Sequence, residues 1–73
     1  MNATAKIILD EKETLKMLRE DFKTFRADEN YADMGAMFWT IFLEAPEGSH
    51  LRKTATKLWK SLTDEEREMC EGA

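Results

Sequence analysis

The chain has 73 residues, enough for one domain with a small core. Its 11 Lys and Arg against 15 Asp and Glu give a formal charge of −4, which disfavours non-specific nucleic-acid binding. The single cysteine, Cys70, excludes an intramolecular disulfide and a cysteine-based metal site. No apolar run approaches the ~20 residues that span a membrane, and the first residues do not resemble a signal peptide. We therefore expect a soluble, cytoplasmic protein with no membrane partner.

With only three Gly and one Pro to interrupt the chain, the composition predicts an all-α fold, a compact bundle of three to four short helices. Residues 1–9 form either a flexible or extended arm or the ragged start of a helix. The first clear helix is predicted over residues 10–26, with Asp10 and Glu13 as a cap pair. Its apolar stripe consists of Leu15, Leu18, Phe22 and Phe25.

The second helix is predicted over residues 30–45, capped by Asp28 or Asn30. Its apolar stripe consists of Tyr31, Met34, Phe38, Ile41, Phe42 and Ala45. Beyond that stripe, Met37, Trp39 and Leu43 extend the apolar surface over most of the circumference. Such a helix is either the central one, packed by several neighbours, or exposes a patch for a partner.

The third helix is predicted over residues 50–62, after a turn at Pro46 and Gly48 and a cap at Ser49. One side of it is apolar and comprises Leu51, Ala55, Leu58 and Leu62. The opposite side is basic and comprises Arg52, Lys53, Lys57 and Lys60. This basic face is either an ordinary solvated surface or a contact for phosphate or for an acidic partner protein.

A short fourth helix is predicted over residues 64–71, because Thr63 followed by Glu66 is the pattern of a capping box. A domain this small has room for one core. We predict that a single buried cluster joins the first three helices, made of Phe22, Phe38, Phe42, Leu58, Trp59 and Leu62.

No arrangement of residues typical of catalysis, cofactor binding or metal binding is found. His50 has no partner at a recognisable spacing, and we expect it to be exposed or to cap a helix. Cys70 has acidic neighbours that raise a thiol pKa, so a packing role is expected. The acidic residues of the last helix lack the spacing of a calcium loop, and the helix dipole is sufficient reason for them. The sequence therefore predicts a non-enzymatic protein.

From residue 36 onward the chain resembles an HMG-box. The resemblance rests on the aromatic-rich segment 36–44, on Lys57-Leu58-Trp59, and on the start of the next helix at Thr63-Asp-Glu-Glu66. It covers about half of the chain and implies an L-shaped packing of helices more than a DNA-bending activity. The chain differs from the family pattern in having Asp28, Glu29 and Asp33 where a basic lead-in stands.

Two functions follow as hypotheses. The first is a small protein–protein interaction module, a regulator, adaptor or inhibitor, that binds another protein or a second copy of itself as a homodimer. Its candidate interface is Met37, Trp39, Leu43, Arg52, Lys53, Lys57 and Lys60. The alternative is an HMG-box-like nucleic-acid-binding domain that uses the basic face of residues 52–60.

Overall fold

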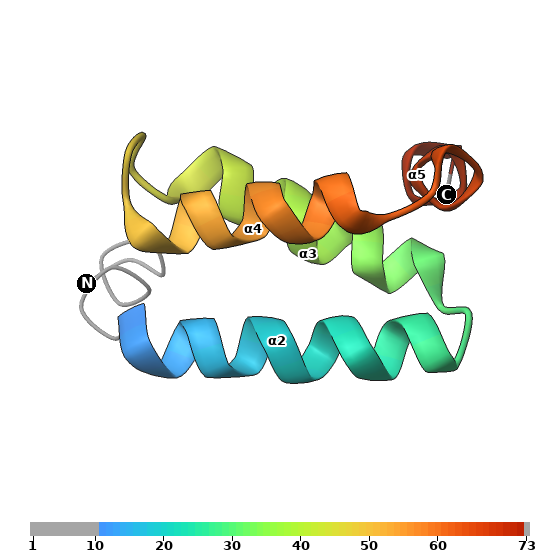
Figure 1. Cartoon of the computed structure of the whole chain (residues 1–73), viewed down its shortest axis with the longest axis horizontal. Coiled ribbons are helices and arrows are strands. Elements are labelled where there is room, and N and C mark those ends of the chain that lie inside the picture. Colours follow the sequence, from blue (N-terminus) through green and yellow to red (C-terminus); the bar gives the residue numbers. More distant parts are fainter. Residues whose placement is uncertain (1–10, 73) are drawn as a thin grey trace.

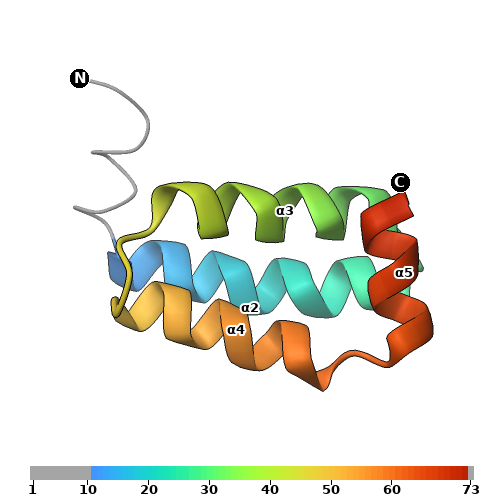
Figure 2. The same cartoon turned by 90° about the horizontal axis from the view of Figure 1, so that it is seen from above.

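The computed structural model describes residues 11–72, which form four helices: α2 (Glu11–Ala27), α3 (Tyr31–Glu44), α4 (His50–Ser61) and α5 (Asp64–Gly72). The helices α2, α3 and α4 run alongside one another, and the short α5 crosses one end of the bundle (Figures 1 and 2). The predicted all-α bundle is confirmed, and every boundary within the described residues agrees to within one residue. Residues 1–9 and the Asp10 cap lie outside the described residues.

Side-chain caps begin three of the helices. The Asn30 side chain accepts a hydrogen bond from a backbone N–H of the first turn of α3 (3.4 Å), and Ser49 does the same for α4 (3.2 Å). At α5, the Thr63 hydroxyl accepts from the Glu66 N–H (3.1 Å), and the Glu66 carboxylate accepts from the Thr63 N–H (3.0 Å). The predicted capping box is confirmed, and of the two residues predicted to cap α3, Asn30 rather than Asp28 does so.

The helix ends determine how the chain reverses. Beyond α2, the Asn30 N–H bonds the Phe25 carbonyl (2.8 Å) and the Glu29 N–H bonds the Arg26 carbonyl (3.2 Å), which is a Schellman arrangement. Glu29 has a φ of +54°, in the left-handed region. Gly48 supplies the second positive φ, +82°, in the turn between α3 and α4. Both turns are short, so α2, α3 and α4 become antiparallel neighbours.

The core lies between α2, α3 and α4, and α5 closes one end of it. Its buried apolar residues are Leu15, Leu18, Phe22, Met34, Phe38, Ile41, Ala45, Leu51, Ala55, Leu62 and Cys70. Phe38 is central, since its ring contacts those of Phe22, Phe42 and Trp59 at centroid distances of 5.9, 6.1 and 5.3 Å. Aromatic pairs at these distances add to the stability that burial alone provides.

The predicted cluster of six residues is contiguous with this core but only half of it is buried. Phe22, Phe38 and Leu62 are buried, whereas Phe42, Leu58 and Trp59 are half-buried and pack against the core from its margin. The prediction of a fully buried cluster is therefore wrong for these last three. In a bundle of three long helices, a side chain at the edge of an apolar stripe is only partly covered by the neighbouring helices. Residues 11–72 contain no further long helix that could cover the rest of it.

Helix α5 is attached to the bundle by the polar side chains of Glu66 and Arg67 and by one close backbone contact. The Arg67 guanidinium donates hydrogen bonds to carbonyls at the end of α4, the shortest of them to Leu62 (2.9 Å). Glu66 accepts two hydrogen bonds from the Arg26 guanidinium on α2 (both 3.0 Å) and one from the Tyr31 hydroxyl on α3 (3.0 Å). Further along, the backbone of α5 at Cys70 lies directly against Gly35 of α3. The orientation of α5 thus follows from polar contacts at its start and from Gly35 of α3, which lets the end of α5 come close.

Candidate interaction surface

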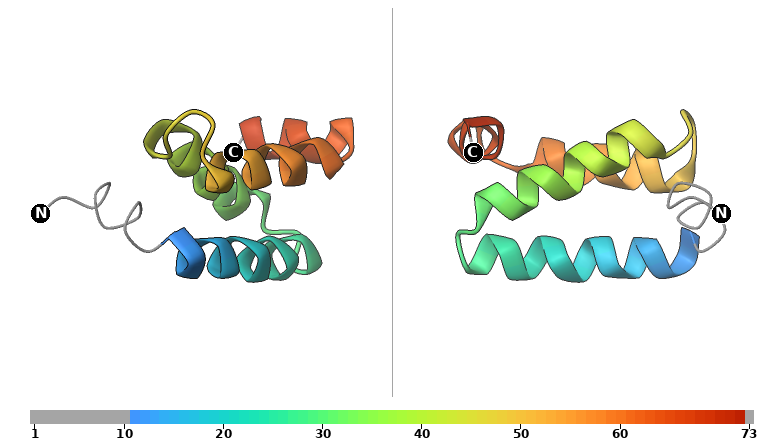
Figure 3. Two further views of the ribbon diagram at one scale, coloured as in Figure 1. Left: turned by 60° about the vertical axis from the view of Figure 1, so that its left-hand side comes forward. Right: turned by 180° about the vertical axis from the view of Figure 1, so that it is seen from behind.

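Helix α3 buries one side and exposes an apolar stripe on the other. The exposed stripe consists of Ala32, Ala36, Trp39 and Leu43, and we call it the outer stripe of α3. Trp39 is 66% and Leu43 67% exposed. Seen from behind in Figure 3, α3 crosses the front of the molecule, and no other helix of residues 11–72 covers it. The two alternatives offered by the sequence, a central helix and a helix with an exposed patch, therefore both apply, because α3 packs in the core and also presents an apolar patch.

The residues of the predicted apolar patch do not all lie together. Trp39 and Leu43 are one helical turn apart on the outer stripe, whereas Met37 is half-buried and packs against the core. Position 37 lies at the edge of the buried side of the helix, next to positions 34 and 41, so its side chain is partly covered by the core. Met17 on α2 and Met69 on α5 are also exposed, but each is a single residue on its own helix, which is common at protein surfaces.

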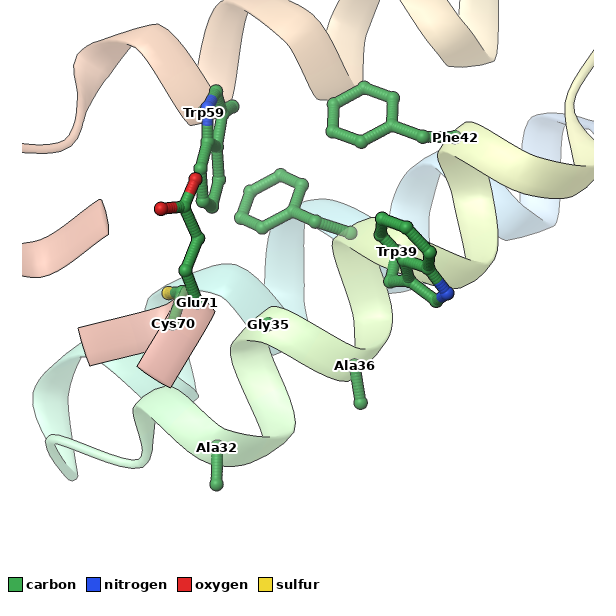
Figure 4. A pocket seen from close by; sticks show the side chains of 9 residues that line it. Ala32, Gly35, Ala36, Trp39, Phe42, Trp59, Cys70 and Glu71 are labelled. Carbon is green, nitrogen blue, oxygen red and sulfur yellow. The ribbon is translucent and has the colours of Figure 1, made fainter. Parts of the chain in front are cut away.

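A pocket of about 530 Å³ opens beside the outer stripe, where α3, α4 and α5 meet. Its walls include Trp39 and Phe42 from α3, Trp59 from α4 and Glu71 from α5 (Figure 4). Gly35 and Cys70 line it where α3 touches α5. The pocket thus offers aromatic surface, with one carboxylate at its edge, and we call it the aromatic pocket.

Of the two residues whose chemistry the sequence raised, Cys70 lines the pocket and His50 does not. Burial raises the pKa of the Cys70 thiol, and the carboxylates of Glu66 and Glu71 raise it further, so Cys70 is a neutral thiol at pH 7. Its burial confirms the predicted packing role. His50 is exposed in the first turn of α4, as expected. Within residues 11–72, no three His, Cys, Asp or Glu side chains are grouped closely enough to hold a metal ion.

Three of the four predicted basic residues lie together on the exposed side of α4. Lys53, Lys57 and Lys60 are exposed and form no ion pair with any residue in the described part of the chain. Arg52 differs, because it is half-buried and its guanidinium donates a hydrogen bond to the Ala45 carbonyl at the end of α3 (3.5 Å). We call the first three residues the lysine face of α4.

Sequence reasoning did not find the aromatic pocket, because it forms only where three helices pack together. Trp59 was assigned to the core, Glu71 was considered only as one of the acidic residues of the last helix, and the packing of α5 brings the two to one site. Gly35 is the residue that could have indicated the pocket, since a glycine inside a helix often marks a close approach of another backbone.

Comparison with known proteins identifies no relative: no family model matches the chain, and no significant match is found among curated proteins or solved structures. The HMG-box resemblance stays a prediction. None of the helices of residues 11–72 combines the length and the apolar composition of a membrane-spanning segment.

Proposed function

We propose that this protein is a small interaction module, a regulator, adaptor or inhibitor, which binds a protein partner through the outer stripe of α3. The observation that carries the proposal is the adjacent exposure of Trp39 and Leu43. A tryptophan offers about 150–250 Å² of contact area and is enriched among residues that dominate binding energies. A contiguous exposed patch of this kind is typical of an interaction site.

The aromatic pocket supports the same proposal. It is concave, it shares Trp39 with the outer stripe, and its lining is mostly apolar. Pockets of this kind receive the anchoring side chain of a partner. The single buried cysteine is in keeping with a reducing cytoplasm as the place of action.

The test is a double variant, Trp39→Ala with Leu43→Ala, compared with the wild type and with Met17→Ala as a control that also removes an exposed apolar side chain. Because both residues are exposed, we expect the double variant to keep its helical circular dichroism and its melting temperature. We expect it to lose the proteins that the tagged wild-type chain captures from the cells of its origin, while Met17→Ala retains them.

Two results would contradict the proposal. If the double variant unfolds, the outer stripe stabilises the fold and is not a free surface. If it folds and captures the same proteins in the same amounts, the binding surface lies elsewhere.

A second candidate function, HMG-box-like nucleic-acid binding, is favoured by the lysine face, whose three cations are exposed on one side of α4. The net charge of −4 opposes it. The test is duplex DNA binding at about 50 mM salt, where phosphate contacts are screened least, with Lys53, Lys57 and Lys60 all changed to Gln as the comparison. Absence of wild-type binding under these conditions would exclude this candidate.

A further inference from the structure

The order of residues along the outer stripe of α3 indicates what can cover it. Its members are spaced by four, three and four residues, which is the a/d spacing of a coiled coil. The two at the N-terminal end, Ala32 and Ala36, are small, and the two at the C-terminal end, Trp39 and Leu43, are large. The stripe therefore changes from small to large along the helix.

A second copy of α3 matches this gradient in only one direction. In an antiparallel pair, a positions pack against d positions, so Trp39 of each copy meets Ala36 of the other and Leu43 meets Ala32. All four layers then combine one large with one small side chain. In a parallel pair each residue meets itself, which places two Trp39 rings in one layer and two small alanines in the next.

We propose that the partner of the outer stripe is a second copy of this chain, bound antiparallel along α3 around a two-fold axis between positions 37 and 38. This inference rests on the proposed function and names its partner. In an isologous interface the same surface of both copies meets, so that surface must be complementary to itself. The outer stripe meets this condition in the size of its side chains. The register places Trp39 of one copy over Ala36 of the other, at the edge of that copy's aromatic pocket.

The residues beside the stripe agree with the antiparallel register. On one side Asp33 comes opposite Thr40 of the second copy, so no carboxylates face each other across the seam. On the other side, Gly35 is covered by the backbone of α5 at Cys70 and Phe42 packs against its own core, so this flank adds no further pairing. A parallel pair would instead oppose Asp33 to Asp33, and like charges in contact weaken association.

The seam is short. Helix α3 has 14 residues and is about 21 Å long, so the interface is smaller than that of an obligate dimer. The dimer should therefore dissociate reversibly on dilution. Light scattering after size exclusion should show a mass that rises with concentration from 8.5 kDa towards twice that value.

A size swap tests the pairing of Ala36 with Trp39. Ala36→Trp alone places large against large in the two central layers, and Trp39→Ala alone leaves them empty, so both variants should be monomers. Ala36→Trp combined with Trp39→Ala restores one large and one small residue in each layer and should recover the dimer. Met17→Ala is the control and should dimerise like the wild type. Failure of the swap to recover dimerisation, with all variants folded, would overturn the proposed register.

Cysteine pairs test the direction. We expect Ala32→Cys mixed with Leu43→Cys to form a disulfide-linked dimer on mild oxidation, and neither variant to do so alone. Both variants also carry Cys70→Ser, so that the native thiol cannot crosslink. Crosslinking of a single variant to itself would indicate a parallel pair and would overturn the inference. A wild-type chain that is still monomeric at about 1 mM would also overturn it. That last result leaves the proposed function standing, because the capture experiment with Trp39→Ala and Leu43→Ala decides it separately.

Discussion

Gly35 is the residue on which the position of α5 depends most directly. A Cβ at this position would overlap the Cys70 carbonyl oxygen, which belongs to backbone and cannot turn aside. Alanine is the better helix former by about 1 kcal/mol, yet we predict that Gly35→Ala lowers the free energy of unfolding by about 1–3 kcal/mol, because α5 must shift. Urea denaturation measures this change.

Gly72→Ala provides the matched control, since an added Cβ meets nothing within 4 Å there. We expect this variant to be as stable as the wild type. If Gly35→Ala proves equally stable or more so, the close approach of α3 and α5 is not maintained in solution.

Glu66 makes stability depend on pH. The backbone hydrogen bond from Thr63 and the hydrogen bonds from Arg26 lower the pKa of its carboxyl from 4.5 to about 2. As the pH falls, the Glu66 carboxyl is therefore protonated in the unfolded chain at a higher pH than in the folded chain. The stabilisation is complete above about pH 4.5 and is lost as the pH falls towards 2.

We predict that Glu66→Gln is less stable than the wild type at neutral pH and loses less stability between pH 4.5 and pH 2. Thermal unfolding of both proteins over that range measures the difference in slope, and the other carboxyl groups cancel because the two proteins share them. Equal slopes would mean that Glu66 is not held by Thr63 and Arg26.

At the scale of the helices, the sequence predicted most of what the structure shows, because the signals are local. A cap at Ser49 or Thr63 acts within three residues, and an apolar stripe repeats within four. The turn that follows α2 was harder to predict from the sequence. Its Schellman arrangement is made with Glu29, where a glycine is the usual residue, so the turn had no glycine to mark it.

The left-handed conformation of Glu29 can be relieved. We predict that Glu29→Gly raises the free energy of unfolding by about 0.5–1 kcal/mol, since glycine adopts a positive φ without a steric penalty. Glu47→Gly is the control, an exposed turn residue without a positive φ, where added freedom of the unfolded chain should destabilise slightly. Chemical denaturation compares the two, and a stabilised Glu47→Gly beside an unchanged Glu29→Gly would contradict the argument.

At the scale of the whole molecule, the candidate site was predicted in part. Trp39 and Leu43 could be named because α3 has more apolar residues than one core can bury. That Met37 turns inward and that Arg52 bonds the end of α3 depend on how the helices pack, which periodicity within one helix does not determine. The aromatic pocket depends on the placement of α5, which follows from the long-range contacts of Glu66.

The size of the core leads to the last prediction. Phe38 is 2% exposed, and its ring contacts aromatic rings on α2, on α4 and on its own helix α3. Leu58, in contrast, is half-buried at the margin of the core. Phe38→Ala should cost about 3–5 kcal/mol, and a chain this short has little more stability than that, so the variant should be largely unfolded. Leu58→Ala should cost about 1–2 kcal/mol, because part of its side chain stays exposed in the folded chain, and should unfold cooperatively at a lower temperature. Circular dichroism with thermal unfolding distinguishes the two results. If Leu58→Ala unfolds as completely as Phe38→Ala, Leu58 is fully covered in solution and belongs to the core rather than to its margin.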